Sequence, residues 1–322
     1  MPEWLYEEGI GENRAALVQA GEILEAQIEL PGELRAGTIA AGRLTTILIP
    51  GRRGIVTLAS GAEALLEPVP PKLTEGAALR VEIVREAIPE KGRSKLPKCR
   101  ATDAQEKPGS SLLDRISANG AAVRRLSHFD VDPLEEAGWS ALTEEALTGE
   151  IEFEGGALRM SVTPAMTLFD VDGALPPPGL AVAGAAAAGR AIRRLGIGGS
   201  IGIDLPTLAA KEERQAAAAA LDAVLPMPFE RTAVNGFGFL QIVRRRERPS
   251  LPELVQGDRI GAAARSLLRR AERSTGTLEA APAVISYLEA RPDWLELLQA
   301  RIGAPAVLRP RPGLAISAGH VQ

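Results

Sequence analysis

The sequence predicts a mixed α/β protein built from several subdomains, and three observations support this prediction. Five short β-rich runs, separated by Gly- and Pro-containing turns, follow one another between residues 37 and 102. Beyond Gly149, strand-like runs alternate with segments long enough for helices. From residue 258 onward the pattern is mostly helical. We therefore expect a small β-barrel near the N-terminus, an α/β layer and a small C-terminal α/β domain.

Composition and charge limit the kinds of binding site and cellular location that this chain could have. The chain has 322 residues, of which 45% are hydrophobic and 3% aromatic, and its net charge is −4. Nucleic-acid binding would therefore need local basic patches. The single cysteine, Cys99, permits no internal disulfide, and with only two histidines any metal should bind to carboxylates. There is neither a membrane-spanning run nor a signal peptide, so we expect a cytoplasmic protein without a membrane partner.

The N-terminal third is predicted to be β-rich. Residues 15–19 and 22–29 alternate apolar and polar side chains around Ala20-Gly21, which indicates a hairpin. The five following strands are expected at residues 38–49, 54–58, 64–67, 79–84 and 98–102. The lengths of these strands and the Gly- and Pro-containing turns between them favour a small barrel of the OB type, although a β-sandwich fragment would have similar spacing.

The remaining elements follow in order. After a linker at 105–110, amphipathic helices are predicted at 112–126 and 132–147. The α/β layer should contain strands at 150–154, 157–162, 165–171, 199–205, 230–234 and 239–244, with helices at 180–195 and 207–224, the latter capped by Thr207. Three C-terminal helices are expected at 258–273, 282–290 and 292–302, with short strands near residues 278 and 306–308.

These elements suggest four parts. Residues 1–36 should pack with the helical segment 105–148, and residues 37–104 should form the barrel. Residues 149–256 should form the α/β subdomain that carries the candidate site. Residues 257–322 should form the small C-terminal domain.

Two aspartates stand at equivalent places in the α/β layer. Asp170 ends one apolar run and Asp204 ends another, and Asp172 follows closely. Ligands commonly bind at the carboxyl ends of strands in α/β sheets, and neighbouring strands would bring both carboxylates within reach of one cation. Mg²⁺ is the expected ion, with Mn²⁺ as the alternative. The competing interpretation is that these aspartates simply end strands, because aspartate favours turns.

Two basic patches are candidates for holding a phosphate backbone. The segment 91–100 contains several cations and no acid, and a second run follows the last strand of the α/β layer. We expect RNA-binding roles for Lys91, Arg93, Lys95, Lys98, Arg244, Arg245 and Arg246, with Phe237 stacking on a base. A charged loop that limits aggregation is the alternative for each patch, and core packing is the alternative for Phe237 or Phe239.

In their order along the chain, these motifs resemble the catalytic region of the ribonuclease E/G family. The most specific stretch runs from Gly198-Gly-Ser-Ile-Gly-Ile-Asp204 to Phe237-Gly-Phe and the arginines 244–246, and it closes with Pro249-Ser-Leu251. Upstream, Gly155-Gly156 and the segment Thr167-Leu-Phe-Asp170-Val-Asp172 also match. The resemblance implies that Asp170 and Asp204 bind magnesium, and that Asp172 replaces a neighbouring asparagine.

The chain also departs from the family pattern. The family's Cys-Pro-x-Cys zinc link has no counterpart near residues 254–258, so we expect no zinc and either a monomer or a simple dimer without that link. The segment between Thr102 and Asp130 is too short for the family's 5′-monophosphate sensor. Aliphatic residues, Ile55 and Leu65 or Leu66, stand where the barrel's stacking aromatics are expected.

The resemblance implies a Mg²⁺-dependent endoribonuclease that cleaves single-stranded RNA, with Asp170, Asp204 and Asp172 as catalytic residues. The products would carry a 5′-phosphate and a 3′-hydroxyl. One alternative is an RNA-binding or regulatory protein on the same scaffold that has lost cleavage. A more distant alternative is a metal-dependent phosphatase or DNase that uses the same carboxylates.

Overall fold

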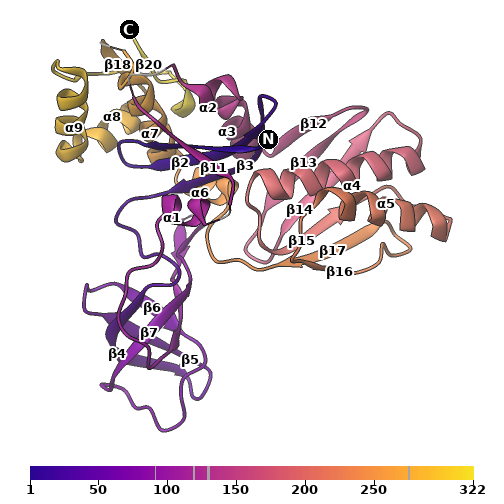
Figure 1. The fold of residues 1–322 in the computed structure, drawn as a ribbon, viewed down its shortest axis with the longest axis horizontal. Helices are drawn as coiled ribbons and strands as arrows, with labels where there is room; N and C mark the ends of the chain where they lie inside the picture. The colour runs from indigo at the N-terminus through magenta and orange to yellow at the C-terminus, as the bar shows by residue number, and fades with distance from the viewer. Residues whose placement is uncertain (91, 119, 129–130, 275) are drawn as a thin grey trace.

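The computed structural model describes the whole chain except residues 91, 119, 129–130 and 275 (Figure 1). The described residues form a mixed α/β fold with several sheets, one of which closes into a five-stranded barrel. The predicted fold class is therefore confirmed at this level, whereas the division into four domains stays a prediction. No described helix is long and apolar enough to cross a membrane.

The N-terminal sheet separates two apolar layers. Its strand order is β11-β1-β2-β3, with β1 at Glu3–Glu8, β2 at Asn13–Gln19, β3 at Glu22–Glu29 and β11 at Ala122–Leu126. Because side chains alternate along a strand, Trp4 and Tyr6 pack on the α1 side, and Leu5 joins the large core on the other side. The predicted hairpin of β2 and β3 is confirmed.

The two helices predicted after the linker are shorter than expected. The helix predicted at 112–126 is wrong beyond Ser117: α1 spans Leu112–Ser117, and residues 122–126 instead form β11 beside β1. Gly120 adopts a φ of +76°, which a helix does not allow, and the following residues complete the sheet edge. The helix predicted at 132–147 is divided at Gly138, with a φ of +95°, into α2 (Pro133–Glu136) and α3 (Trp139–Thr148).

The barrel contains the five strands that the sequence predicts. Their order around the barrel is β10-β6-β5-β4-β7, formed by Lys98–Ala101, Glu63–Leu66, Arg53–Leu58, Ile39–Ile49 and Ala78–Arg85. Cys99 lies in the barrel core, and burial raises the pKa of its thiol to about 12. The segment 91–100 is not a simple loop, because β8 (Ile88–Glu90) and β9 (Arg93–Lys95) form a small hairpin ahead of β10.

The central layer is a six-stranded sheet covered on one face by two helices (Figure 1). Its order is β12-β13-β14-β15-β17-β16, formed by Glu150–Phe153, Gly156–Val162, Thr167–Gly173, Gly199–Asp204, Phe239–Arg244 and Glu230–Arg231. The covering helices are α4 (Pro177–Arg194) and α5 (Lys211–Val224). Helix α5 begins four residues later than predicted, so Thr207 is not its cap. The alternating side chains of the opposite face remain exposed or half-buried.

The C-terminal part packs three helices with a small sheet. Helices α7 (Arg259–Ala271), α8 (Pro282–Glu289) and α9 (Pro292–Ile302) form a second apolar cluster with the sheet β19-β18-β20. These strands span Val307–Pro310, Thr277–Ala280 and His320–Val321, and a short 3₁₀ helix, η1 (Ile316–Ala318), precedes the last one. The sequence did not predict α6 (Leu251–Gly257), which packs on α3 and leads into α7.

Candidate active site

Asp170 and Asp204 are direct neighbours on the exposed face of the central sheet. They are register partners on the parallel strands β14 and β15, and both side chains are exposed. Their inward neighbours, Phe169 and Ile203, are fully buried against the helices. Because adjacent strands lie about 4.8 Å apart and register partners project from the same face, both carboxylates have access to one small ligand. The structure therefore brings together the two aspartates that the sequence singled out.

Asp172 lies on the same exposed face, beyond the end of β15. An ion pair of 3.5 Å joins it to Arg159, which is the register partner of Asp170 on β13. Arg159 also lies 3.9 Å from Glu150, and its own side chain is mostly exposed. A cation thus borders the acidic pair on one side. Sequence reasoning missed Arg159, although a four-residue turn at 163–166 between alternating strands would have indicated its position opposite Asp170.

An aromatic surface borders the pair on the other side. Phe239 is the register partner of Asp204 on β17, and its ring lies over Gly202. Phe237 lies in the loop before β17, and 84% of its surface is exposed. The side-chain oxygen of Asn235 accepts hydrogen bonds from the backbone N–H groups of Phe237 and Phe239, at 2.9 and 3.0 Å. The loop therefore presents an open aromatic ring two residues before Phe239, the register partner of Asp204.

The donor set fits a hard divalent cation with a largely hydrated coordination shell. No group of three or more His, Cys, Asp or Glu side chains among the described residues is arranged to hold a metal ion. Two adjacent carboxylates nevertheless suit Mg²⁺, because this ion usually takes one or two protein carboxylates and completes its shell with water and phosphate oxygens. The pair resembles such an open site more than a closed structural one.

The arginines 244–246 lie away from the carboxylates. Arg244 is the register partner of Gly199 at the opposite end of β17, five residues and therefore about 17 Å from Phe239. Because side chains alternate along a strand, Arg244 projects from the helix-covered face, whereas Phe239 projects from the exposed face. Arg246 forms an ion pair with Glu253 of α6, and Arg245 lies 2.9 Å from Glu247. The structure therefore does not place this basic run beside the acidic pair.

Arg244 and Arg245 instead line a separate basic cavity of about 330 Å³ with Arg115, Arg193 and Arg248. Arg244 donates to the carbonyl of Ile197 at 3.0 Å. Burial, together with the nearby Arg193, lowers the pKa of Arg244 against the opposing effect of Glu25. Four of the five arginines already have a carboxylate partner: Glu25 for Arg193, Glu29 for Arg115, and Glu247 for both Arg245 and Arg248. Among the described residues, Arg244 is the member of this group without an ion pair, so it is the arginine most available to an anion.

The cations of segment 91–100 are largely neutralised by acids from elsewhere in the chain. Lys95 lies 2.5 Å from Glu90, Lys98 lies 2.8 Å from Glu67, and Arg93 lies 3.3 Å from Glu90. Arg100 is paired with Glu82 in the same way. Lys91 lies outside the described residues. The sequence segment itself contains no acid, so these pairings could not be predicted from it.

The barrel presents aliphatic side chains where stacking aromatics were expected. Ile55 and Leu65 are register partners on β5 and β6, and both are half-buried on the barrel wall. Leu66 points inward and is fully buried. Of the two alternatives at this position, Leu65 is therefore the surface residue.

Comparisons with known proteins leave the family open. A scan of protein-family models and a search of curated proteins found no match to this chain. The candidate site therefore depends on the geometry of its own residues, and the ribonuclease E/G resemblance remains a proposal.

Proposed function

We propose that the protein is a Mg²⁺-dependent endoribonuclease that hydrolyses phosphodiester bonds within single-stranded RNA. One observation carries the proposal: Asp170 and Asp204 are register partners on adjacent parallel strands and are both exposed. The order of motifs along the chain, which resembles the ribonuclease E/G family, supports the choice of RNA as substrate. By the same resemblance the products carry a 5′-phosphate and a 3′-hydroxyl.

Each residue of the site has a separate task in this proposal. Asp170 and Asp204 hold the ion at the sheet surface, and the ion pair with Arg159 keeps Asp172 beside them. When bound, Mg²⁺ would lower the pKa of a coordinated water and neutralise charge on the phosphate under attack. Phe237 would stack on an unpaired base, which favours single-stranded substrates.

The arginine-lined cavity supports a phosphate contact away from the reacting bond. It lies at the other end of β17, and five arginines contribute to its lining. It does not depend on the aspartates, so it also favours the second candidate function, an RNA-binding protein without cleavage.

A cleavage assay distinguishes the two candidates. We expect an unstructured, end-labelled RNA to be cut in Mg²⁺ and to stay intact in EDTA. Asp204→Asn should reduce the rate by at least about a hundredfold, because it removes a charged ligand of the ion. Asp103→Asn is the matched control, because Asp103 is an exposed aspartate outside the site.

Binding of RNA without cutting, in Mg²⁺ or Mn²⁺, would reject the nuclease in favour of the binding protein. Faster hydrolysis of DNA or of small phosphate esters would instead indicate a metal-dependent DNase or phosphatase.

A further inference from the structure

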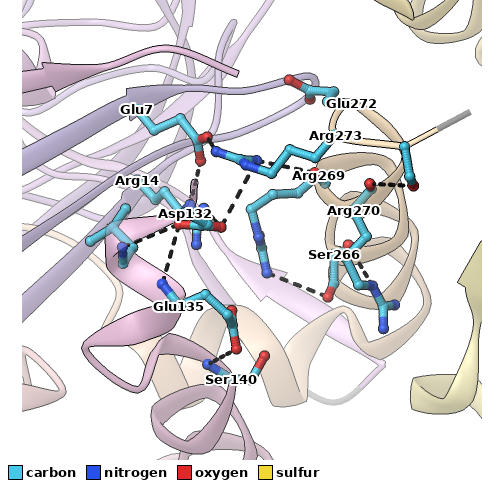
Figure 2. Close-up of polar contacts among 12 residues, drawn as sticks. Glu7, Arg14, Asp132, Glu135, Ser140, Ser266, Arg269, Arg270, Glu272 and Arg273 are labelled. Atoms are coloured by element: carbon cyan, nitrogen blue, oxygen red, sulfur yellow. Dashed lines mark hydrogen bonds and ion pairs between the residues drawn. The ribbon is translucent and has the colours of Figure 1, made fainter. Parts of the chain in front are cut away.

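A second cavity, of about 460 Å³, lies between helices α3, α6 and α7. Its size is within the range of small-molecule binding pockets. Arg269, Arg270 and Ser266 project from α7 opposite Ser140 of α3 (Figure 2). The cavity is lined by neither the carboxylate pair nor the arginines of β17, so the proposed nuclease chemistry does not account for it.

One part of the lining is apolar and comes from three separate elements. Leu147 of α3, Leu254 and Val255 of α6 and Ala262 of α7 contribute to it. Leu254 and Val255 are themselves buried in the surrounding core, so this surface is fixed by packing. It can accept the hydrocarbon or aromatic part of a ligand.

The other part of the lining is cationic. Four arginines, Arg259, Arg265, Arg269 and Arg270, line the cavity together with two glutamates, Glu12 and Glu144. Glu12 is already shared by Arg265, at 3.2 Å, and Arg269. Among the described residues, neither Arg259 nor Arg270 has a carboxylate partner in an ion pair. Arg265 is also paired with Asp258 at 3.5 Å, so the exposed Arg259 and Arg270 are the cations open to a ligand.

A buried donor in the same lining lacks a partner. Trp139 is fully buried, and its Nε1–H has no hydrogen-bond acceptor among the described residues. The guanidinium of Arg14 lies 5.1 Å from the centre of the indole ring, which fixes the ring in place. Because Trp139 has no exposed surface, a ligand cannot reach this N–H, and the residue contributes only packing to the lining.

We propose that this cavity binds a small amphipathic organic anion. The carboxylate, sulfonate or phosphate group of the ligand would meet Arg270 at the cavity surface, and Arg259, about 16 Å away along α7, would add to the positive potential. Its apolar body would lie on Leu147, Leu254 and Val255. Such a ligand would bridge α3, α6 and α7.

The test uses the full chain and the fluorescent anion anilinonaphthalene sulfonate as the probe. We expect saturable binding of one probe per chain, weakened by NaCl. The double variant Arg259→Ala/Arg270→Ala should weaken binding by about tenfold or more, because charge-assisted contacts are lost. The matched control is Arg52→Ala/Arg80→Ala, which removes two exposed arginines of the barrel region and should leave the affinity unchanged.

Two further variants test the cavity itself. Ser266→Trp places a ring in the cavity and should abolish probe binding, with circular dichroism verifying the fold. Thr143→Trp narrows the cavity from the α3 side and should weaken probe binding several-fold. Probe binding that is equal in the wild type, the double arginine variant and Ser266→Trp would overturn the proposal.

Discussion

At the scale of single residues, the site depends on which side chains share the exposed face of the central sheet. Asp170, Asp204 and Phe239 lie on that face, whereas their chain neighbours Phe169 and Ile203 lie in the core. An aspartate at the end of an apolar run is visible in the sequence, and both candidates were predicted in this way. The position of Arg159 beside them depends on the register of β13 against β14, which the pattern within β14 alone does not contain.

Phe237→Ala tests the role of the exposed aromatic ring. We expect binding of single-stranded RNA to weaken by about 1–3 kcal/mol, the usual value of one base–aromatic stack. Stability should hardly change, because 84% of Phe237 is exposed. Fluorescence anisotropy with a labelled oligonucleotide measures the affinity, and Val243→Ala, an exposed apolar residue near the other end of β17, is the control. Equal losses in both variants would argue against stacking by Phe237.

At the scale of secondary-structure elements, the carboxylates are placed by the parallel pairing of β14 and β15. Helix α4 connects these strands and packs closely on the first of them through small residues. A Cβ atom on Gly184 would lie 2.4 Å from Cγ1 of Val171. Val171 stands between Asp170 and Asp172 on β14. The contact between helix and sheet therefore supports the strand that carries Asp170 and Asp172.

A pair of glycine substitutions in α4 tests this contact. Gly184→Ala should destabilise the protein by about 1–3 kcal/mol, because the added methyl group overpacks the interface with Val171. Gly179→Ala, in the first turn of the same helix, meets nothing within 4 Å and should be neutral or stabilising by about 0.5–1 kcal/mol. Urea unfolding measures both changes. Equal effects of the two substitutions would contradict the close packing of α4 on β14.

Helices and strands could be predicted where the spacing of apolar residues agrees with the Gly and Pro residues that mark the turns. The barrel strands and α9 follow their sequence signals closely. The apolar residues of 122–126 continue the helical spacing of those in 112–117, which is why the sequence predicts one helix over both segments. They form a strand because they complete an edge beside β1, more than a hundred residues away. Local spacing contains no information on such a distant partner.

At the scale of the whole molecule, a buried ionic network joins the N-terminal sheet, α2 and the C-terminal helices (Figure 2). Arg14 lies 2.5 Å from both Glu7 and Asp132, and Arg273 at the end of α7 contacts Glu7 as well. Glu12 binds Arg265 and Arg269 of α7 in parallel. Glu7 and Glu12 are more than two hundred residues away from these arginines in the chain, so local spacing could not predict the pairs.

Glu7→Gln tests the contribution of the network to stability. It leaves the buried Arg14 with one carboxylate fewer, and we expect a loss of about 3–5 kcal/mol in the free energy of unfolding. Glu3→Gln on the same strand removes an exposed pair with Arg124 and should cost about 1 kcal/mol or less. A loss below 1 kcal/mol for Glu7→Gln in denaturant unfolding would show that the network does not hold these parts together.

The network also predicts how stability depends on pH. Burial alone would raise the pKa of Asp132, but the charge and hydrogen bond of Arg14 outweigh it and hold this pKa below its usual value. A lowered folded-state pKa contributes stability above the unfolded-state value, and this stability is lost as the pH falls through the folded-state pKa. The free energy of unfolding should therefore decrease on acidification below the usual aspartate range. Asp132→Asn should reduce this dependence, and an unchanged acid profile would contradict the assignment.

The central claim is that Asp170 and Asp204 share one divalent cation, and a Mn²⁺ titration followed by electron paramagnetic resonance tests it most directly. We expect one site per chain in the wild type and in Asp103→Asn. Asp170→Asn and Asp204→Asn should each weaken that site by at least about tenfold, and the double variant should weaken it by less than the two losses combined, because both changes act on one shared site. Unchanged Mn²⁺ binding in both single variants would contradict the claim.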